Sequence, residues 1–205
     1  MEWSKMAWLA SGLLVAVGLG VVVVRASFAG KYEEPDYTVV QQTDTLEVRD
    51  YGPRLLAEVT MGTDRDTGAN TGFRTLAAYI FSDETPEGAP IGMTVPVGQY
   101  ESDEGTWRMW FVMPSRYTVD NLPPPTDPRI RILERAPERL AVRSLSGRMD
   151  RANFSEDAAQ LEADARAAGL EPIGPATLAV YNGPFTPGPF RRNEVMLPVR
   201  VVEAP

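Results

Sequence analysis

From residue 37 onward, apolar and polar positions mostly alternate, and this period of two predicts half-buried β-strands. Short clusters of Gly, Pro, Asp and Asn separate the alternating runs and are typical of turns. The pattern predicts nine strands: Thr38–Val40, Leu46–Asp50, Leu55–Thr60, Met93–Tyr100, Trp107–Met113, Ile130–Glu134, Leu140–Ser146, Ala176–Tyr181 and Val195–Val202.

Two stretches show the helical period instead. The first predicted helix runs from Asn70 to Phe81, with apolar residues at positions i, i+3, i+4 and i+7. The second begins at Asn153, where Glu156 would complete a capping box, and stops before Gly169. The apolar faces comprise Phe73, Leu76, Ala77 and Ile80 in the first helix and Phe154, Ala158, Leu161, Ala165 and Ala168 in the second.

The same order of elements occurs twice. YGPRLLAEV (51–59) and RAPERLAVRS (135–144) each place a Pro-centred turn before an alternating strand. A helix follows in both halves, and then Ile91-Gly92 or Ile173-Gly174 leads into another strand. The pattern indicates an α+β domain of duplicated β-α-β units, with two helices packed on a curved antiparallel sheet.

The N-terminal segment is a separate region. Met6–Val24 is an uncharged apolar run between Lys5 and Arg25, close to the length that spans a bilayer as a helix. Ser27-Phe28-Ala29 also resembles a small-x-small cleavage site, so a secretory signal is the alternative to a membrane anchor. We expect an uncleaved anchor with the domain on the extracytoplasmic (periplasmic) side, although the flanking basic residues do not fix this orientation.

Within this run, Gly12, Ala16 and Gly20 recur every four residues. Such a stripe of small residues lets two membrane helices approach closely, so it suggests a weak homodimer. The expected organisation is an anchor or signal over residues 1–25, a polar tether over 26–36 and a single domain over 37–205.

Composition narrows the range of functions. The net charge of −8 argues against a nucleic-acid partner, which would require a basic surface. The chain has no cysteine and no histidine, and both lysines (Lys5 and Lys31) precede the domain. Catalysis by Ser-His-Asp or Cys-His groups, a lysine Schiff base and a histidine-ligated zinc are therefore excluded from the domain. A binding protein is favoured over an enzyme.

Seven short strings occur in an order that resembles the SOUL heme-binding protein family. The resemblance extends from about Glu34 to Val202. Each string alone is weak evidence, but the ordered set is specific. The strings are EVRDY (47–51), GF..L..YI (72–80), IGMTVPV (91–97), FVMP (111–114), LPPPTDP (122–128), YNGP (181–184) and RRNEV (191–195).

The resemblance implies a distorted antiparallel β-barrel flanked by two helices, and it implies heme or another tetrapyrrole as the ligand. In the family, the tetrapyrrole is thought to lie against the first helix and the loop before the RRNEV-like strand. An apolar slot would hold the porphyrin faces, and arginines would pair with its propionates. The residues implied at this site are Asn70, Phe73, Arg74, Ala77, Tyr181, Phe190 and Arg191.

The sequence departs from one branch of that family, in which a histidine is proposed to ligate the iron. Without His or Cys, axial ligation would fall to Met or Tyr, such as Met93, Met113, Tyr79 or Tyr181. Packing roles are favoured for both methionines. Tyr79 and Tyr181 remain possible ligands. Otherwise the heme is expected to be held by its faces and propionates, without a strong protein ligand and with no assigned metal-ligating residue. A small-molecule effector or carrier domain for another flat ligand remains open, as does an enzyme using Asp, Glu or Tyr.

Overall fold

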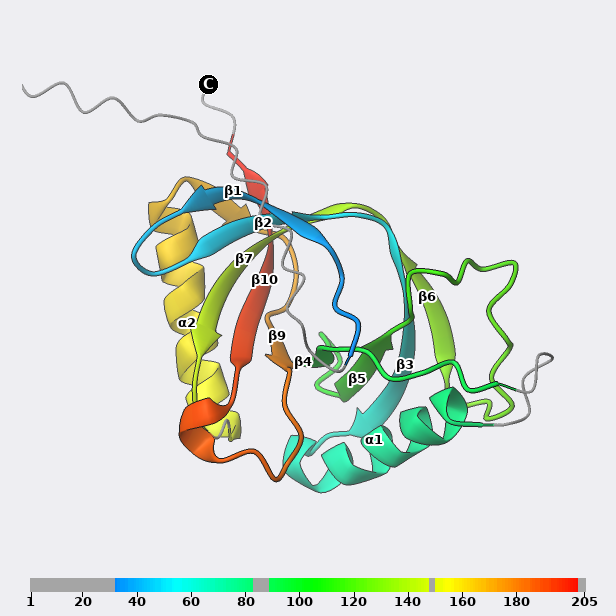
Figure 1. Cartoon of the computed structure of the whole chain (residues 1–205). Coiled ribbons are helices and arrows are strands. Elements are labelled where there is room, and N and C mark those ends of the chain that lie inside the picture. The colour runs from blue at the N-terminus through cyan, green and yellow to red at the C-terminus, as the bar shows by residue number, and fades with distance from the viewer. Residues whose placement is uncertain (1–31, 83–88, 148–149, 203–205) are drawn as a thin grey trace, which may run out of the picture.

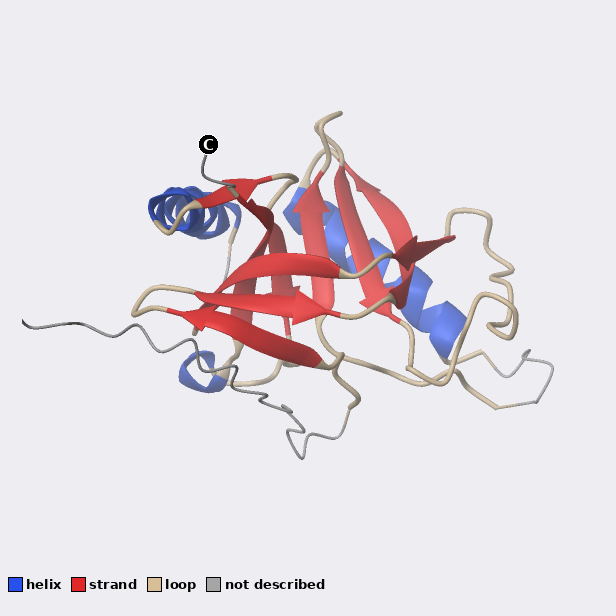
Figure 2. Cartoon of the chain, turned by 90° about the horizontal axis from the view of Figure 1, so that it is seen from above, coloured by secondary structure: helices blue, strands red, loops and turns tan. Residues whose placement is uncertain are grey.

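The computed structural model describes residues 32–82, 89–147 and 150–202. Within these residues the chain forms one strongly curled antiparallel sheet of ten strands and two α-helices (Figures 1 and 2). The elements are β1 (Tyr37–Gln42), β2 (Glu47–Tyr51), β3 (Arg54–Gly62), α1 (Arg65–Ile80), β4 (Val97–Glu101), β5 (Trp107–Val112), β6 (Arg131–Arg135), β7 (Glu138–Leu145), α2 (Arg151–Ala167), β8 (Leu170–Pro172), β9 (Thr177–Val180), a 3₁₀ turn η1 (Gly188–Phe190) and β10 (Asn193–Val201).

The strand order shows the internal duplication. The sheet runs β1-β2-β7-β10-β9-β4-β5-β3-β6, with β8 paired to the end of β10. The order is symmetric about the β9–β4 pair, because β10 corresponds to β5, β7 to β3 and β2 to β6. β2 therefore pairs with β7 of the other half, and β6 pairs with β3, so neither half completes its sheet alone.

Both helices cover the same face of the sheet. α1 packs on β3 and β5, where Leu76 and Ile80 join a buried cluster with Phe111. α2 packs on β7, β8 and β10, where Phe154 and Leu161 join a second cluster. Figure 1 shows α2 beside β7 and β10, and α1 along β3 and β5. The structure confirms the predicted α+β class, and the sheet is a curled half-barrel rather than a closed barrel.

Both helices begin earlier than the sequence predicts. α1 starts at Arg65 rather than Asn70, and the Asp64 side chain caps it by accepting from the Thr67 amide at 3.0 Å. Its first turns bury Gly68 and Gly72 instead of large apolar side chains, so the hydrophobic period does not reveal them. α2 starts at Arg151, and its N-cap is Asp150 rather than Asn153. The predicted capping box at Asn153 and Glu156 was therefore wrong.

The strands also differ from the pattern in two places. The predicted strand Met93–Tyr100 is shorter, since β4 begins only at Val97. Pro96 has no N–H for a ladder, and Thr94 forms only an isolated bridge with Glu33. β8 was not predicted, because three residues are too few to show a period.

The predicted anchor, its small-residue stripe and most of the tether lie outside the described residues. Among the residues that the structure does describe, none of the helices has the length and apolar character needed to span a membrane.

α1 approaches β3 closely at Gly68, where a Cβ atom would collide with the backbone of Met61. A backbone atom cannot move aside as a side chain can. Gly68→Ala should therefore lower the free energy of unfolding by about 1–3 kcal/mol. This loss would occur even though Ala is intrinsically the better helix former by about 1 kcal/mol.

Chemical denaturation of this variant beside Gly52→Ala checks the prediction. A Cβ at Gly52 would meet no atom within 4 Å, so that control should change stability little. Equal stability of the two variants would contradict the close approach of α1 to β3.

Candidate functional site

The face of the sheet opposite the helices carries the candidate site. Along β3, Leu55, Ala57 and Val59 point toward α1, so the alternate residues Leu56 and Glu58 point to the other side. β5 and β10 divide their side chains in the same way. This second surface is called the open face below.

A cavity of about 330 Å³ lies on the open face, where the two halves meet. Its size falls at the lower end of the range of small-molecule sites. Trp110 of β5 is packed directly over the backbone of Gly98 in β4, where any larger residue would clash with the indole. The lining residues are Arg54, Leu56, Tyr100, Trp110, Arg135, Glu138, Leu140, Ile173, Gly174, Pro175, Thr177, Met196 and Pro198.

Two arginines line this cavity, and they differ in their ion pairing. Arg54 forms an ion pair with Glu138, which also lines the cavity. Arg135 is half-buried and has no ion-pair partner among the residues that the structure describes. Arg135 is therefore the cation that could pair with an acidic ligand without losing a protein partner.

A buried carboxylate lies on the first half of the open face. Glu58 is 2% exposed and accepts hydrogen bonds from the Tyr100 hydroxyl at 2.8 Å and from Arg108 at 3.0 Å. Burial, followed by the hydrogen bond to Glu58, raises the pKa of Tyr100 to about 12. The phenol is thus a neutral donor at physiological pH.

A larger ionic cluster lies on the second half. Glu194 is completely buried and accepts from both Arg49 (2.9 Å) and Arg192 (3.0 Å), as well as from the Tyr181 hydroxyl at 2.7 Å. Burial alone would raise the pKa of Glu194, but the two arginines outweigh it and hold the pKa below its usual value. Burial raises the pKa of Tyr181 well above that of a free phenol.

The N-terminal segment joins this cluster. The Glu34 carboxylate binds the Arg192 guanidinium through two hydrogen bonds of 2.8 and 3.0 Å. The same guanidinium lies over the Tyr181 ring, 3.7 Å from its centre. Glu34 and Pro35 lie beside Tyr181 and Trp110, and these four residues line one small cavity. The end of the predicted tether is fixed to the domain.

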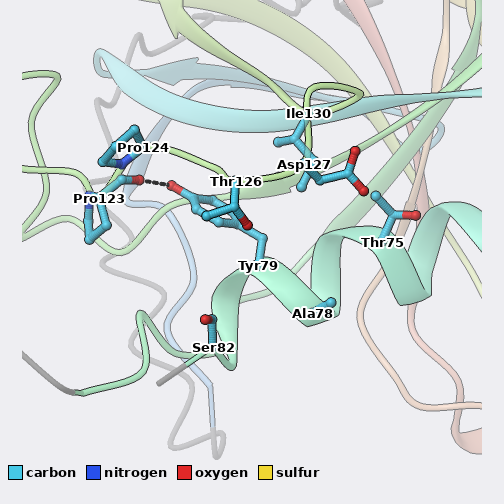
Figure 3. A pocket seen from close by; sticks show the side chains of 9 residues that line it. All are labelled: Thr75, Ala78, Tyr79, Ser82, Pro123, Pro124, Thr126, Asp127 and Ile130. Atoms are coloured by element: carbon cyan, nitrogen blue, oxygen red, sulfur yellow. Dashed lines mark hydrogen bonds between the residues drawn. The ribbon is translucent and has the colours of Figure 1, made fainter. Parts of the chain in front are cut away.

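A second, smaller cavity of about 100 Å³ lies under the C-terminal half of α1 (Figure 3). The Tyr79 hydroxyl points across it and donates to the Pro123 carbonyl at 2.5 Å. Asp127 at its rim is hydrogen-bonded to Arg129, which lowers the pKa of Asp127 to about 2. This cavity is too small for a tetrapyrrole.

Four of the predicted site residues share α1. Asn70 and Arg74 are exposed, and Ala77 is half-buried. Phe73 is 40% exposed, and its ring packs against Phe111 at a centroid distance of 5.3 Å. These residues lie on the helix side of the sheet.

The other three predicted residues are divided between two places. Phe190 projects from the loop before β10 and is 77% exposed. The Arg191 guanidinium donates to the carbonyl oxygens of Thr186 and Pro184 in the same loop, so it braces the loop. Tyr181 points to the open face and therefore lies on the other side of the sheet from Phe73.

The open-face cavity was not predicted from the sequence. One feature of the sequence could have indicated it. LLAEV in β3 and MWFV in β5 are apolar at almost every position, and the structure buries them throughout. Strands that are apolar on both faces require a second packing surface besides the helices.

The comparisons with known proteins agree with this fold. The family model described as SOUL heme-binding protein matches residues 32–198. The chain belongs to the SOUL heme-binding protein family. No curated protein matches the SOUL chain significantly.

Several solved structures share the fold at low identity. The EcmrR C-terminal domain is 9% identical with a TM-score of 0.59, and the match covers 77% of this chain and 98% of that one. An uncharacterized conserved protein from Listeria innocua is 14% identical with a TM-score of 0.56, covering 78% and 95% of the two chains. A hydrolase from the same organism is 15% identical with a TM-score of 0.54, covering 78% and 94%. At these identities the likeness shows the fold alone.

Replacing the central carboxylate should be costly. Glu194→Gln keeps the shape but removes the buried counter-charge of Arg49 and one of the two carboxylates that bind Arg192, so the free energy of unfolding at pH 7 should fall by about 3 kcal/mol. The folded pKa of Glu194 lies below its unfolded value, so its contribution is complete above that unfolded value and is lost as the pH falls through the folded pKa. The stability difference between wild type and variant should therefore narrow in acid.

Urea denaturation across pH 3–7 tests both parts of this prediction. Glu171→Gln is the matched control, because Glu171 forms an exposed ion pair with Arg200 and its loss should matter little. A difference that is small at pH 7, or that widens in acid, would contradict the role assigned to Glu194.

Proposed function

We propose that the protein binds a flat amphiphilic ligand of the tetrapyrrole type in the open-face cavity. The observation that supports this best is the cavity between the two halves, where the Trp110 indole, Met196 and Leu140 provide apolar surface beside Arg135. A planar ligand would lie against the apolar side chains, and its carboxylate would pair with Arg135. The cavity is small, so part of the ring would remain in solvent.

The side chains fit the faces and carboxylates of heme better than its iron. The sequence has neither histidine nor cysteine. The Tyr100 and Tyr181 hydroxyls donate to buried carboxylates. Turning either hydroxyl toward a metal would leave its carboxylate without that hydrogen bond. Met113 is buried in the core under α1, whereas Met196 places a thioether at the cavity. We therefore propose binding through contacts and charge, without a strong axial ligand.

The same reasoning supports a second candidate ligand. A metal-free porphyrin or another flat hydrophobic acid would make every contact proposed for heme. We propose a binding or carrier function rather than catalysis, because Glu58 and Glu194, the two carboxylates buried among the described residues, are both paired with arginines. The pKa of Glu194 is held below its usual value, so this carboxylate is not poised to exchange a proton at neutral pH.

For cellular location, we propose that Met6–Val24 anchors the protein in a membrane with the domain on the extracytoplasmic side. The support is the uncharged run of about 20 residues, which is sufficient to span a bilayer. A weak dimer through Gly12, Ala16 and Gly20 is part of the same proposal.

The protein should bind hemin and metal-free protoporphyrin with similar affinity, since neither relies on a protein–iron bond. Bound hemin should show a Soret band of weakly ligated or five-coordinate iron. Absorption titrations with both compounds test this expectation. A low-spin six-coordinate spectrum, or no spectral change with excess of either compound, would count against the proposal.

Reversing the charge of a single arginine tests where the ligand binds. Arg135→Glu should weaken porphyrin binding by about tenfold or more, because an attractive pair becomes a repulsive one. The matched control is Arg74→Glu on α1, the position implied by the family resemblance. If the ligand instead lies against Asn70, Phe73, Arg74 and Ala77 and under Phe190 and Arg191, the order of the two effects will be reversed. Circular dichroism would check that both variants remain folded.

A further inference from the structure

The loop between β9 and β10 presents two phenylalanines to solvent. Phe185 is 97% exposed and Phe190 is 77% exposed. The segment GPFTPGPF (183–190) contains no charged residue, although 23% of the chain is charged. Exposed aromatic side chains within an uncharged segment are characteristic of surfaces that contact an apolar partner.

This loop is held in one conformation by its own hydrogen bonds. The Thr186 amide donates to Gly183, and the Phe190 amide donates to Pro187. The Arg191 guanidinium donates to the Thr186 carbonyl at 2.7 Å, and the Gly147 amide donates to Gly188 at 3.0 Å. The two aromatic side chains therefore project from a loop whose conformation is fixed by hydrogen bonds.

The N-terminal segment ends beside the base of this loop. Glu34 is bound to Arg192, which is two residues beyond Phe190. The apolar run ends at Val24, and the nine residues from Arg25 to Glu33 that separate it from Glu34 can span at most about 35 Å. An apolar segment inserted in a bilayer would hold the loop close to the same bilayer.

We propose that the loop 183–190 is a second membrane contact, with Phe185 and Phe190 entering the interface of the bilayer that holds Met6–Val24. Aromatic side chains are favoured at that depth, and the lack of charge on the loop lowers the cost of leaving water. The contact is apolar rather than electrostatic, because the protein is acidic and its nearest cation, Arg191, is engaged within the loop. The proposal depends on insertion of the N-terminal run and not on the ligand.

The absence of cysteine makes a site-specific probe simple to introduce. The full chain carrying Phe185→Cys is labelled with an environment-sensitive fluorophore and reconstituted into phosphatidylcholine vesicles. The control is Ala136→Cys, at the exposed turn between β6 and β7. This turn adjoins the start of β7, whereas the loop contacts Gly147 just beyond the end of β7 (Figure 1).

The Phe185 probe should emit at shorter wavelength than the Ala136 probe, and nitroxide-labelled lipids should quench it strongly. Adding Phe190→Ser should shift its emission back toward that of the solvent-exposed control. The proposal is overturned if the chain does not float with the vesicles, or if the two probes behave alike. It is also overturned if the blue shift disappears when the protein is diluted in lipid, since that would indicate a contact between protein chains.

Discussion

The carboxylate of Glu194 links parts of the chain that are otherwise far apart in sequence. It is completely buried, and it is held by Arg49 from β2, by Arg192 before β10 and by Tyr181 after β9. A charge in this position is tolerable only while all these partners remain. The cluster therefore fixes how β2 crosses to the second half of the sheet, and Arg192 extends it to the N-terminal segment through Glu34.

The two faces of the sheet have different roles for a physical reason. On one face the helices pack on the sheet and bury most of its apolar side chains. The open face has no covering helix in the described structure. Its buried carboxylates, Glu58 and Glu194, are paired with arginines, and Trp110, Met196 and Leu140 border a cavity. The fold therefore has its main core on one side of the sheet and a cavity on the other.

The duplicated architecture places this cavity at the junction of the halves. β9 and β4 pair at the centre, and the exchange of β2 and β6 between halves holds the two sides in register. In a chain without histidine or cysteine, the proposed site would hold its ligand through surface and charge.

The sequence by itself determined the α+β class, the duplication, both helices and most of the strands, because these depend on periods of two and 3.6 that local spacing reveals. It also excluded histidine and cysteine chemistry and indicated the family. It did not reveal the first turns of α1, where Gly68 and Gly72 face the core, because close backbone packing leaves no hydrophobic signal. Only the tertiary structure brought Glu34, Arg49 and Glu194 together, and only it placed Tyr181 and Phe73 on opposite faces. Contacts between residues more than a hundred positions apart arise from strand pairing across the halves, which local spacing does not encode.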